Sequence, residues 1–239
     1  MRYGTETHDG GMLPFNLSEI DRLLSTTKAV RRRLDLTRPV SRDVITECIR
    51  LACYAPNASN GQEWRWVVLD DRQQIRRAGE LYRDILVPRV STMLETKLAD
   101  GDEAGARISR SILYLAGKMP EVPVMVVPSY DRSTKLERYS RLLQEQITMS
   151  PEMSSATYGS IYPAVWSFQL ALRSRGLGSV FTTAHQFDQP GMAKILGIPE
   201  TWDQTCLIPV AYVTGDDFTP SPRGPVEDVI VWNHGPRQI

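Results

Sequence analysis

The run VPVMVVP, residues 122 to 128, constrains the fold more than any other stretch of the chain. It is apolar throughout, rich in β-branched residues and too short for an ordinary helix. Its two prolines stand near its ends, where a strand tolerates them. The run therefore predicts a buried strand, and the remaining elements must be built around it. The chain has 239 residues, 41% of them hydrophobic, which is enough apolar material for one sizeable core.

Helical and strand patterns alternate on both sides of this run. Short β-rich segments predict three further strands, at residues 64–70, 178–183 and 207–215. Amphipathic patterns predict helices at residues 41–55, 158–175 and 189–196, and in much of 71–118. We expect Ser18 and Ser41 to cap two helices, Pro88 to break the 71–118 segment, and the acid-rich stretch 99–105 to form a loop.

Charge and cysteine content exclude several classes of protein. Lys plus Arg and Asp plus Glu both number 28, so the net charge is zero, whereas binding nucleic acid or an anionic membrane requires a surplus of cations. Cys48, Cys53 and Cys206 form no CxxC pair and lie in apolar runs, which is typical of free buried thiols in a reducing compartment. The chain shows neither a leader pattern nor a run of about 18 apolar residues. We expect a cytoplasmic protein without nucleic-acid or membrane partners.

The common catalytic signatures are absent from the sequence. It has no GxGxxG, GxxxxGK[ST] or GxSxG motif, and its three histidines are isolated from one another and from the cysteines. We therefore expect no metal site and no catalytic nucleophile. For His185 an ordinary structural role is favoured, with proton donation as the alternative.

A cluster of cations stands out in TTKAVRRRLD, residues 26–35, which contains Lys28, Arg31, Arg32 and Arg33. Such a run is either a solvated face or a site for a small anion. After the next helix, PNASNGQEW (residues 56–64) offers amide and hydroxyl groups in a turn-forming segment. This loop is either a ligand-wrapping loop for a polyhydroxylated or heterocyclic compound or a plain polar turn.

Four motifs, KAVRRRL, APNASNGQEWRW, RGLGSVFTT and SPRGPVEDVIVW, occur in an order and spacing that resemble the FMN-dependent nitroreductase family. The resemblance spans residues 20–233, its first motif is similar to that of actinobacterial members, and residues 85–155 are the least comparable. It implies an α+β fold with a central, mostly antiparallel sheet flanked by helices. It also implies a single domain over residues 1–239, with a variable lid or insert at about 85–155. A C-terminal arm, residues 216–239, would embrace the partner in an intertwined homodimer.

The resemblance also implies a cofactor site for FMN. Lys28 stands where the family has its first phosphate-binding arginine, and Val30 replaces a phosphate-contacting serine. Arg32, or Arg31 after a one-residue slip, matches the cation at the pyrimidine edge of the flavin. Glu63 replaces a common proline. The loop matched to the flavin ring and ribityl chain contains Asn57, Ser59, Asn60 and Gln62.

Two later segments complete this implied site. Thr182, Thr183 and Ala184 match the segment over the flavin ring, with the backbone N–H of Thr183 or Ala184 facing N5. Arg223 matches a late phosphate-binding arginine. No side chain is expected to be a catalytic group, because the flavin itself reacts.

The implied activity is an NAD(P)H oxidoreductase that reduces nitroaromatic or quinone-like acceptors by a ping-pong, two-electron mechanism. Dehalogenation, enone reduction, flavin fragmentation and non-catalytic flavin binding remain alternatives on such a scaffold. Candidates for the substrate lid are Tyr82, Met93, Tyr114, Tyr139 and Met149.

Overall fold

The computed structural model describes residues 15–215 and 218–233. The chain divides into two compact units, one formed by Lys28–Asp216 and the other by Met1–Thr27 together with Asp217–Ile239. Each unit is described by itself. The predicted C-terminal arm, residues 216–239, lies partly outside the described residues, and both it and the single-domain boundary of 1–239 stay predictions.

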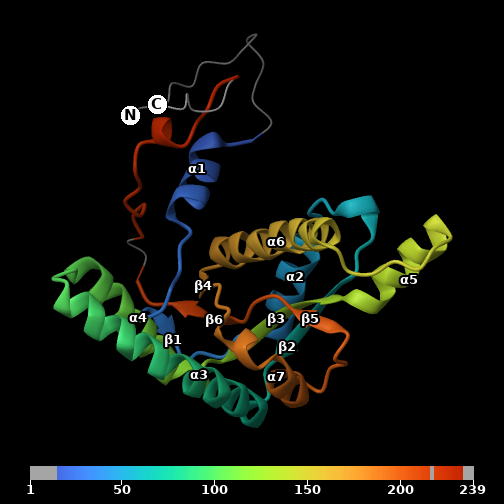
Figure 1. The fold of residues 1–239 in the computed structure, drawn as a ribbon. Helices are drawn as coiled ribbons and strands as arrows, with labels where there is room; N and C mark the ends of the chain where they lie inside the picture. The colour runs from blue at the N-terminus through green and yellow to red at the C-terminus, as the bar shows by residue number, and fades with distance from the viewer. Residues whose placement is uncertain (1–14, 216–217, 234–239) are drawn as a thin grey trace. The chain divides into compact units, whose positions relative to one another are not determined.

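A six-stranded sheet forms the centre of the larger unit (Figure 1). Its strands are β1 (Leu34–Asp35), β2 (Trp64–Leu69), β3 (Val124–Asp131), β4 (Leu177–Ser179), β5 (Trp202–Gln204) and β6 (Ile208–Val213). The order is β1-β6-β3-β2, with β4 paired to β6 and β5 paired to β3. Every pairing is antiparallel. The expected α+β class with an antiparallel sheet is confirmed.

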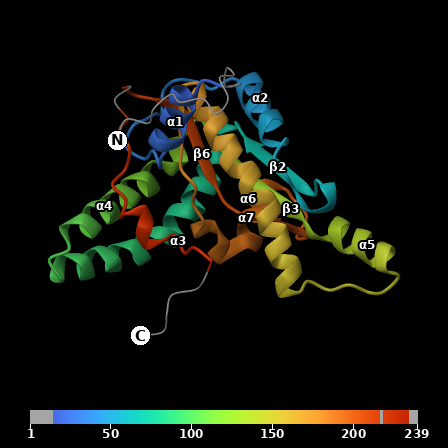
Figure 2. The same ribbon diagram turned by 90° about the horizontal axis from the view of Figure 1, so that it is seen from above.

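Helices cover both faces of this sheet (Figures 1 and 2). On one face lie α2 (Arg42–Ala52) and α6 (Pro151–Ser174), and on the other lie α3 (Arg72–Ala99) and α7 (Gln189–Leu196). Helix α4 (Glu103–Lys118) packs along α3, and α5 (Arg132–Leu143) follows β3 directly. Short 3-10 turns occur at η2 (Ala58–Asn60), η3 (Met119–Glu121) and η4 (Ala184–Asp188).

Strand β3 lies in the interior of the unit: all eight of its residues are buried. A strand that is covered on both faces does not alternate apolar with polar residues, which explains why residues 122–128 are uniformly apolar. Val124, Val126 and Tyr130 join a core cluster with Ile45 of α2 and Phe168 of α6. The predicted buried strand is confirmed, although it begins at Val124 rather than at residue 122.

Two expectations about helices of the larger unit were wrong. Helix α3 continues through Pro88 instead of breaking there; it packs against α4 and η3, and Tyr82 and Val90 are buried on either side of the proline. The contact is close at Gly79, where a Cβ would lie 2.5 Å from the backbone nitrogen of Pro120. Helix α6 begins at Pro151, seven residues before the expected start, with Ser150 as its N-cap.

The smaller unit contains α1 (Leu17–Thr26) and the short turn η5 (Val226–Asp228). The side chain of Asn16, not Ser18, caps α1 by accepting a hydrogen bond from the backbone N–H of Glu19 at 3.3 Å. Over residues 15–215 and 218–233, no helix combines the length and apolarity needed to cross a bilayer.

Candidate functional site

A cavity of about 220 Å³ brings together three segments of the larger unit that are far apart in sequence. Arg31 lines it from the cationic segment, residues 26–35, and the turn after β4 contributes Thr182, Thr183 and Ala184. Helices α3 and α4 form much of the remaining wall. Two of the motifs singled out in the sequence therefore meet at one place.

Arg31 supplies the positive charge of this cavity. Burial lowers the pKa of its guanidinium, and nearby Tyr82 raises it in partial compensation. In the described parts of the chain, no carboxylate forms an ion pair with Arg31. A half-buried cation without a carboxylate partner is suited to receive an external anionic or electron-rich group.

Arg32 points to a different place. Its guanidinium lies over the ring of Tyr114 in α4, 4.9 Å from the ring centroid, and it does not line the cavity. Of the two arginines that the sequence left open for the flavin edge, the structure places Arg31 in the cavity.

Backbone pairing fixes the cationic segment against the sheet. The N–H of Val30 donates to Ser179 O at 3.0 Å, and the N–H of Thr214 donates to Arg33 O at 2.9 Å. The Arg33 Nε atom donates back to Thr214 O at 2.7 Å, which gives Arg33 a structural role. Strand β1 follows at once, with Leu34 opposite Val213. These bonds hold the backbone beside Arg31 in place.

The segment after β4 carries unused backbone donors. Thr182 exchanges backbone hydrogen bonds with Leu207 at 3.2 and 2.8 Å, and its hydroxyl also donates to Leu207 O. Over the described ranges, nothing accepts from the N–H of Thr183 or Ala184. Both residues line the cavity and Ala184 is buried, so two backbone donors without a described acceptor belong to residues of the cavity wall.

The walls contain residues that sequence reasoning did not single out: Leu86, Ile112, Leu115, Phe181 and Phe187. Of the proposed lid candidates, Tyr82 is the one that lines the cavity, and burial raises its pKa to about 12. An apolar, aromatic wall beside a few polar groups is typical of a pocket for a flat heterocycle. These wall residues had no signal of their own, because apolar residues in helices usually belong to the core.

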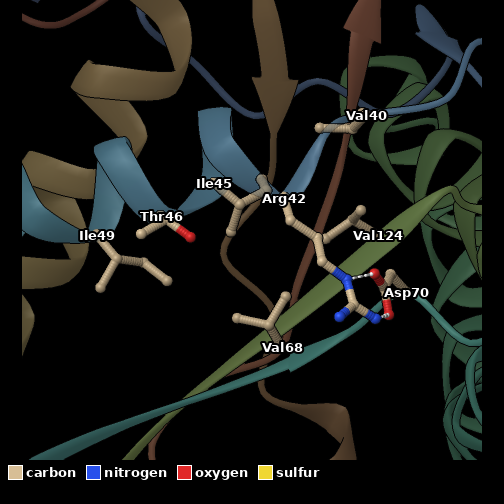
Figure 3. Close-up of a pocket in the computed structure, with 8 residues that line it drawn as sticks. All are labelled: Val40, Arg42, Ile45, Thr46, Ile49, Val68, Asp70 and Val124. Atoms are coloured by element: carbon tan, nitrogen blue, oxygen red, sulfur yellow. Dashed lines mark hydrogen bonds and ion pairs between the residues drawn. The ribbon is translucent and has the colours of Figure 1, made fainter.

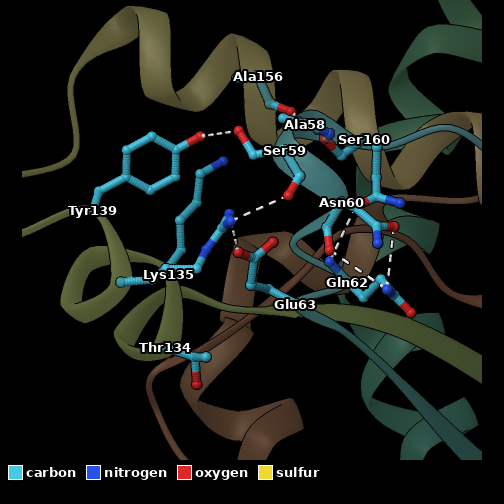
Figure 4. A network of polar contacts seen from close by, with 12 residues as sticks. Ala58, Ser59, Asn60, Gln62, Glu63, Thr134, Lys135, Tyr139, Ala156 and Ser160 are labelled. Atoms are coloured by element: carbon cyan, nitrogen blue, oxygen red, sulfur yellow. Dashed lines mark hydrogen bonds and ion pairs between the residues drawn. The ribbon is translucent and has the colours of Figure 1, made fainter. Parts of the chain in front are cut away.

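The loop with Asn57, Ser59, Asn60 and Gln62 lies beside α5 and α6 (Figure 4). Asn57 and Gln62 line a separate cavity of only about 10 Å³, beside Glu63 and Tyr130. No residue of this loop lines the cavity around Arg31. A single chain therefore does not assemble the whole predicted site around one cavity.

The two remaining predicted cations do not line the Arg31 cavity either. Lys28 is half-buried at the start of the larger unit. Arg223 belongs to the smaller unit, where its guanidinium donates to Pro222 O at 2.8 Å. Their roles at a phosphate stay predictions.

A second cavity, of about 260 Å³, lies between α2 and strands β2 and β3 (Figure 3). Its walls are mostly aliphatic, and its one cation, Arg42, forms an ion pair with Asp70 that raises the pKa of Arg42 and lowers that of Asp70. None of the predicted site residues lines it, so it is not the site that the sequence indicated.

His185 is fully buried directly after Ala184. Neither ring nitrogen has a hydrogen-bond partner among the described residues, and burial lowers its pKa to about 4. The imidazole is therefore neutral near pH 7, which favours the structural interpretation over proton donation. The same described ranges contain no group of three or more His, Cys, Asp or Glu side chains placed to hold a metal ion.

Solved structures with the same fold are numerous. The nitroreductase family protein of Streptococcus pneumoniae TIGR4 is 20% identical, with a TM-score of 0.63 over 90% of this chain and 100% of that one. NfrA2 of B. megaterium is 16% identical, with a TM-score of 0.66 over 92% of this chain and 76% of that one. A BluB-like flavoprotein from Clostridium difficile 630 is 16% identical, with a TM-score of 0.60 over 90% and 99%.

At these identities the structural likeness shows the fold, and no curated protein matches the sequence. The sequence model of the nitroreductase family matches residues 25–212. This range includes the cationic segment, the Asn57–Gln62 loop, the whole sheet except the last residue of β6, and the Arg31 cavity. The chain belongs to the nitroreductase family.

Proposed function

We propose that this protein is an FMN-dependent NAD(P)H oxidoreductase that reduces nitroaromatic or quinone-like acceptors by a ping-pong, two-electron mechanism. Membership of the nitroreductase family supports a flavin oxidoreductase in general. The observation that carries the specific proposal is the cavity in which Arg31 and the free N–H groups of Thr183 and Ala184 share an aromatic wall. These groups match what a flavin ring requires of a protein.

Each of these groups has a defined task in the proposal. Bound FMN would supply the hydride chemistry, accepting two electrons from NAD(P)H and passing them to the acceptor. Arg31 would hold the electron-rich pyrimidine edge and stabilise the negative charge that reduction places there. The N–H of Thr183 or Ala184 would orient the ring by donating to N5. Lys28 and Arg223 would bind the phosphate.

We further propose that the site is completed by a second copy of the chain. The cavity of about 220 Å³ is smaller than the ~300–1,000 Å³ of usual ligand pockets, and the Asn57–Gln62 loop does not reach it. Tyr158, Tyr162 and Trp166 form an exposed stripe on α6, and Tyr162 packs edge-on against Phe181 at the cavity wall. A partner that covers this stripe would bury the aromatic rings and bring its own loop to the cavity.

The first experiment is a visible absorption spectrum of the purified protein, followed by NADPH and then a nitroaromatic or a quinone under anaerobic conditions. The proposal expects flavin bands that bleach with NADPH, or with NADH, and return with the acceptor. Bands that neither nucleotide bleaches would overturn it in favour of another flavin chemistry or of flavin storage. A colourless protein that cannot be loaded with FMN would overturn every flavin interpretation.

Light scattering at several protein concentrations tests whether the protein forms the dimer that would complete the site. Trp166→Glu places a charge on the exposed stripe, and we expect it to produce monomers with weakened FMN binding. Ile108→Glu, on the exposed surface of α4, is the matched control. A wild-type protein that is monomeric while saturated with FMN would contradict the two-copy site.

A further inference from the structure

The Asn57–Gln62 loop holds an unusual backbone conformation. Ser59, Asn60 and Gln62 have φ angles of 52°, 48° and 53°, all in the left-handed region. Residues other than glycine rarely adopt this region, and three within four positions is a local concentration of strain. A loop of this kind keeps its shape only when surrounding contacts enforce it.

Contacts within the loop and with α6 supply part of this enforcement. The N–H of Gln62 donates to Asn57 Oδ1 at 3.0 Å, and the N–H of Gly61 donates to Ala58 O at 3.0 Å. From outside, Ser160 of α6 accepts from the N–H of Ala58 at 2.9 Å. These bonds fix the two ends of the loop and leave its middle to another support.

Helix α5 provides that support (Figure 4). The Nη1 atom of Arg138 donates to Ser59 O at 3.4 Å, and the hydroxyls of Ser59 and Tyr139 lie 3.3 Å apart. Both contacts are made at Ser59, the first residue of the strained stretch. The middle of the loop therefore rests on two neighbouring side chains of α5.

An ion pair fastens α5 to the end of the loop. Glu63 is only 6% exposed, and its Oε1 atom lies 2.5 Å from Arg138 Nη2. The pair is packed against Gly61, because a Cβ there would collide with both Glu63 Oε1 and Arg138 Nη2. The same guanidinium forms the ion pair with the Glu63 carboxylate and donates a hydrogen bond to the Ser59 carbonyl, so charge attraction at Nη2 and a hydrogen bond at Nη1 tie the loop to α5 on both sides of its bend.

We propose that Glu63 and Arg138 form a latch through which α5 sets the geometry of the Asn57–Gln62 loop. Both are positioning residues in this proposal, because they act on the ligand site through the loop that they hold. The inference rests on the proposed function in one respect, namely that this loop receives the flavin. The latch itself is a property of the polypeptide and can be measured without cofactor.

The test compares four variants. Arg138→Ala and Glu63→Gln each remove one half of the latch, and Arg138→Lys keeps the charge while losing the forked geometry. Arg132→Ala is the matched control, because it deletes another α5 arginine whose ion pair, with Asp203 at 2.7 Å, lies outside the loop. Circular dichroism establishes which variants fold. If Arg138→Ala does not fold, Glu63→Gln tests the latch in its place.

Hydrogen exchange of the amides of residues 58–62, measured on protein freed of flavin, is the first readout. We expect exchange at least tenfold faster in Arg138→Ala and Glu63→Gln, an intermediate rate in Arg138→Lys, and no change in Arg132→Ala. Unchanged exchange in folded Arg138→Ala and Glu63→Gln would overturn the latch, whatever the protein binds.

FMN affinity and the position of the flavin absorption bands form the second readout. The proposal expects affinity to fall several-fold and the bands to shift in the variants with fast exchange, and in no others. Fast exchange with unchanged affinity and bands would overturn the positioning role while leaving the ion pair as a support of the loop. A wild-type protein that binds no FMN would overturn both this role and the proposed function, and the exchange data would still decide whether α5 holds the loop.

Discussion

Gly178 and Val30 lie in contact across the junction between β4 and the cationic segment. A Cβ on Gly178 would come within 3.1 Å of the Val30 Cβ and 2.6 Å of Val213 Cγ1. Val30 is buried at this point, so the residue that replaces the expected serine has a packing role beside Arg31. The glycine is required by the close approach of two segments rather than by its backbone angles.

This contact predicts a loss of stability in Gly178→Ala. The added methyl group has no free space, and overpacking of this kind typically costs about 1–3 kcal/mol. Gly117→Ala is the control, because Gly117 is exposed in α4 with no atom within 4 Å of a new Cβ, and we expect a gain of about 0.5–1 kcal/mol. Urea unfolding measures the free energy of unfolding of both variants. Equal unfolding midpoints for Gly178→Ala and Gly117→Ala would contradict the close approach of Val30 and Val213 to Gly178.

The different placements of Arg31 and Arg32 predict different effects of the same substitution. Arg31→Ala should weaken FMN binding about 10- to 100-fold, corresponding to the ~1.5–3 kcal/mol of a hydrogen bond to a charged group. Arg32→Ala removes a guanidinium that stacks on Tyr114 outside the cavity and should leave the affinity within about threefold, the scale of an exposed contact. Quenching of FMN fluorescence measures both dissociation constants. A larger loss of FMN affinity in Arg32→Ala than in Arg31→Ala would show that Arg32, not Arg31, binds the pyrimidine edge of the flavin.

Arg223 is predicted to bind the FMN phosphate. Arg223→Ala should reduce FMN affinity by about 1.5–3 kcal/mol while leaving the unfolding temperature of the flavin-free protein unchanged. Gel filtration at high dilution, with absorbance read at flavin and protein wavelengths, reports the cofactor retained. If the variant keeps its full complement of flavin, the alignment of the C-terminal motif is wrong.

His185 predicts a pH dependence of stability. Its pKa is about 4 in the folded protein and near 6.5 when exposed, so the unfolded chain binds the proton more readily between these values. Its contribution is therefore complete above pH 6.5 and falls as the pH drops toward 4, by about 3 kcal/mol in total. Urea unfolding of the wild type and His185→Asn from pH 4 to 7.5 isolates this effect. Parallel stability curves would show that the histidine is not buried as a neutral group.

Local signals in the sequence predicted some elements closely. Helix α7 was expected at residues 189–196 and occupies Gln189–Leu196, because Pro190 marks its start and Gly197 ends it in the left-handed conformation. Ser41 caps α2 as expected, although the side-chain bond to Val44 is long at 3.4 Å. Capping residues and uniformly apolar runs act locally, so they can be recognised without the tertiary structure.

The errors occurred where distant packing decides the local structure. Nothing adjacent to Pro88 in the sequence indicates that α3 packs against α4 and η3 and buries Tyr82 and Val90 on either side of the proline. The separation of the Asn57–Gln62 loop from the Arg31 cavity was equally invisible, because a motif order does not reveal which motifs share one cavity. The Glu63–Arg138 pair joins residues 75 positions apart, and the sequence marked Glu63 only as an unexpected substitution for proline.

The pairing of the cationic segment with the sheet has a thermodynamic consequence. Val30 and Arg33 form backbone hydrogen bonds with Ser179 and Thr214, so the main chain beside Arg31 is fixed before any ligand binds. Capture of an anionic ligand then restricts mainly the outer torsions of one guanidinium, and little main-chain entropy is lost. Calorimetry of ligand binding should therefore show no large unfavourable entropy of the kind produced when a disordered segment becomes ordered on binding.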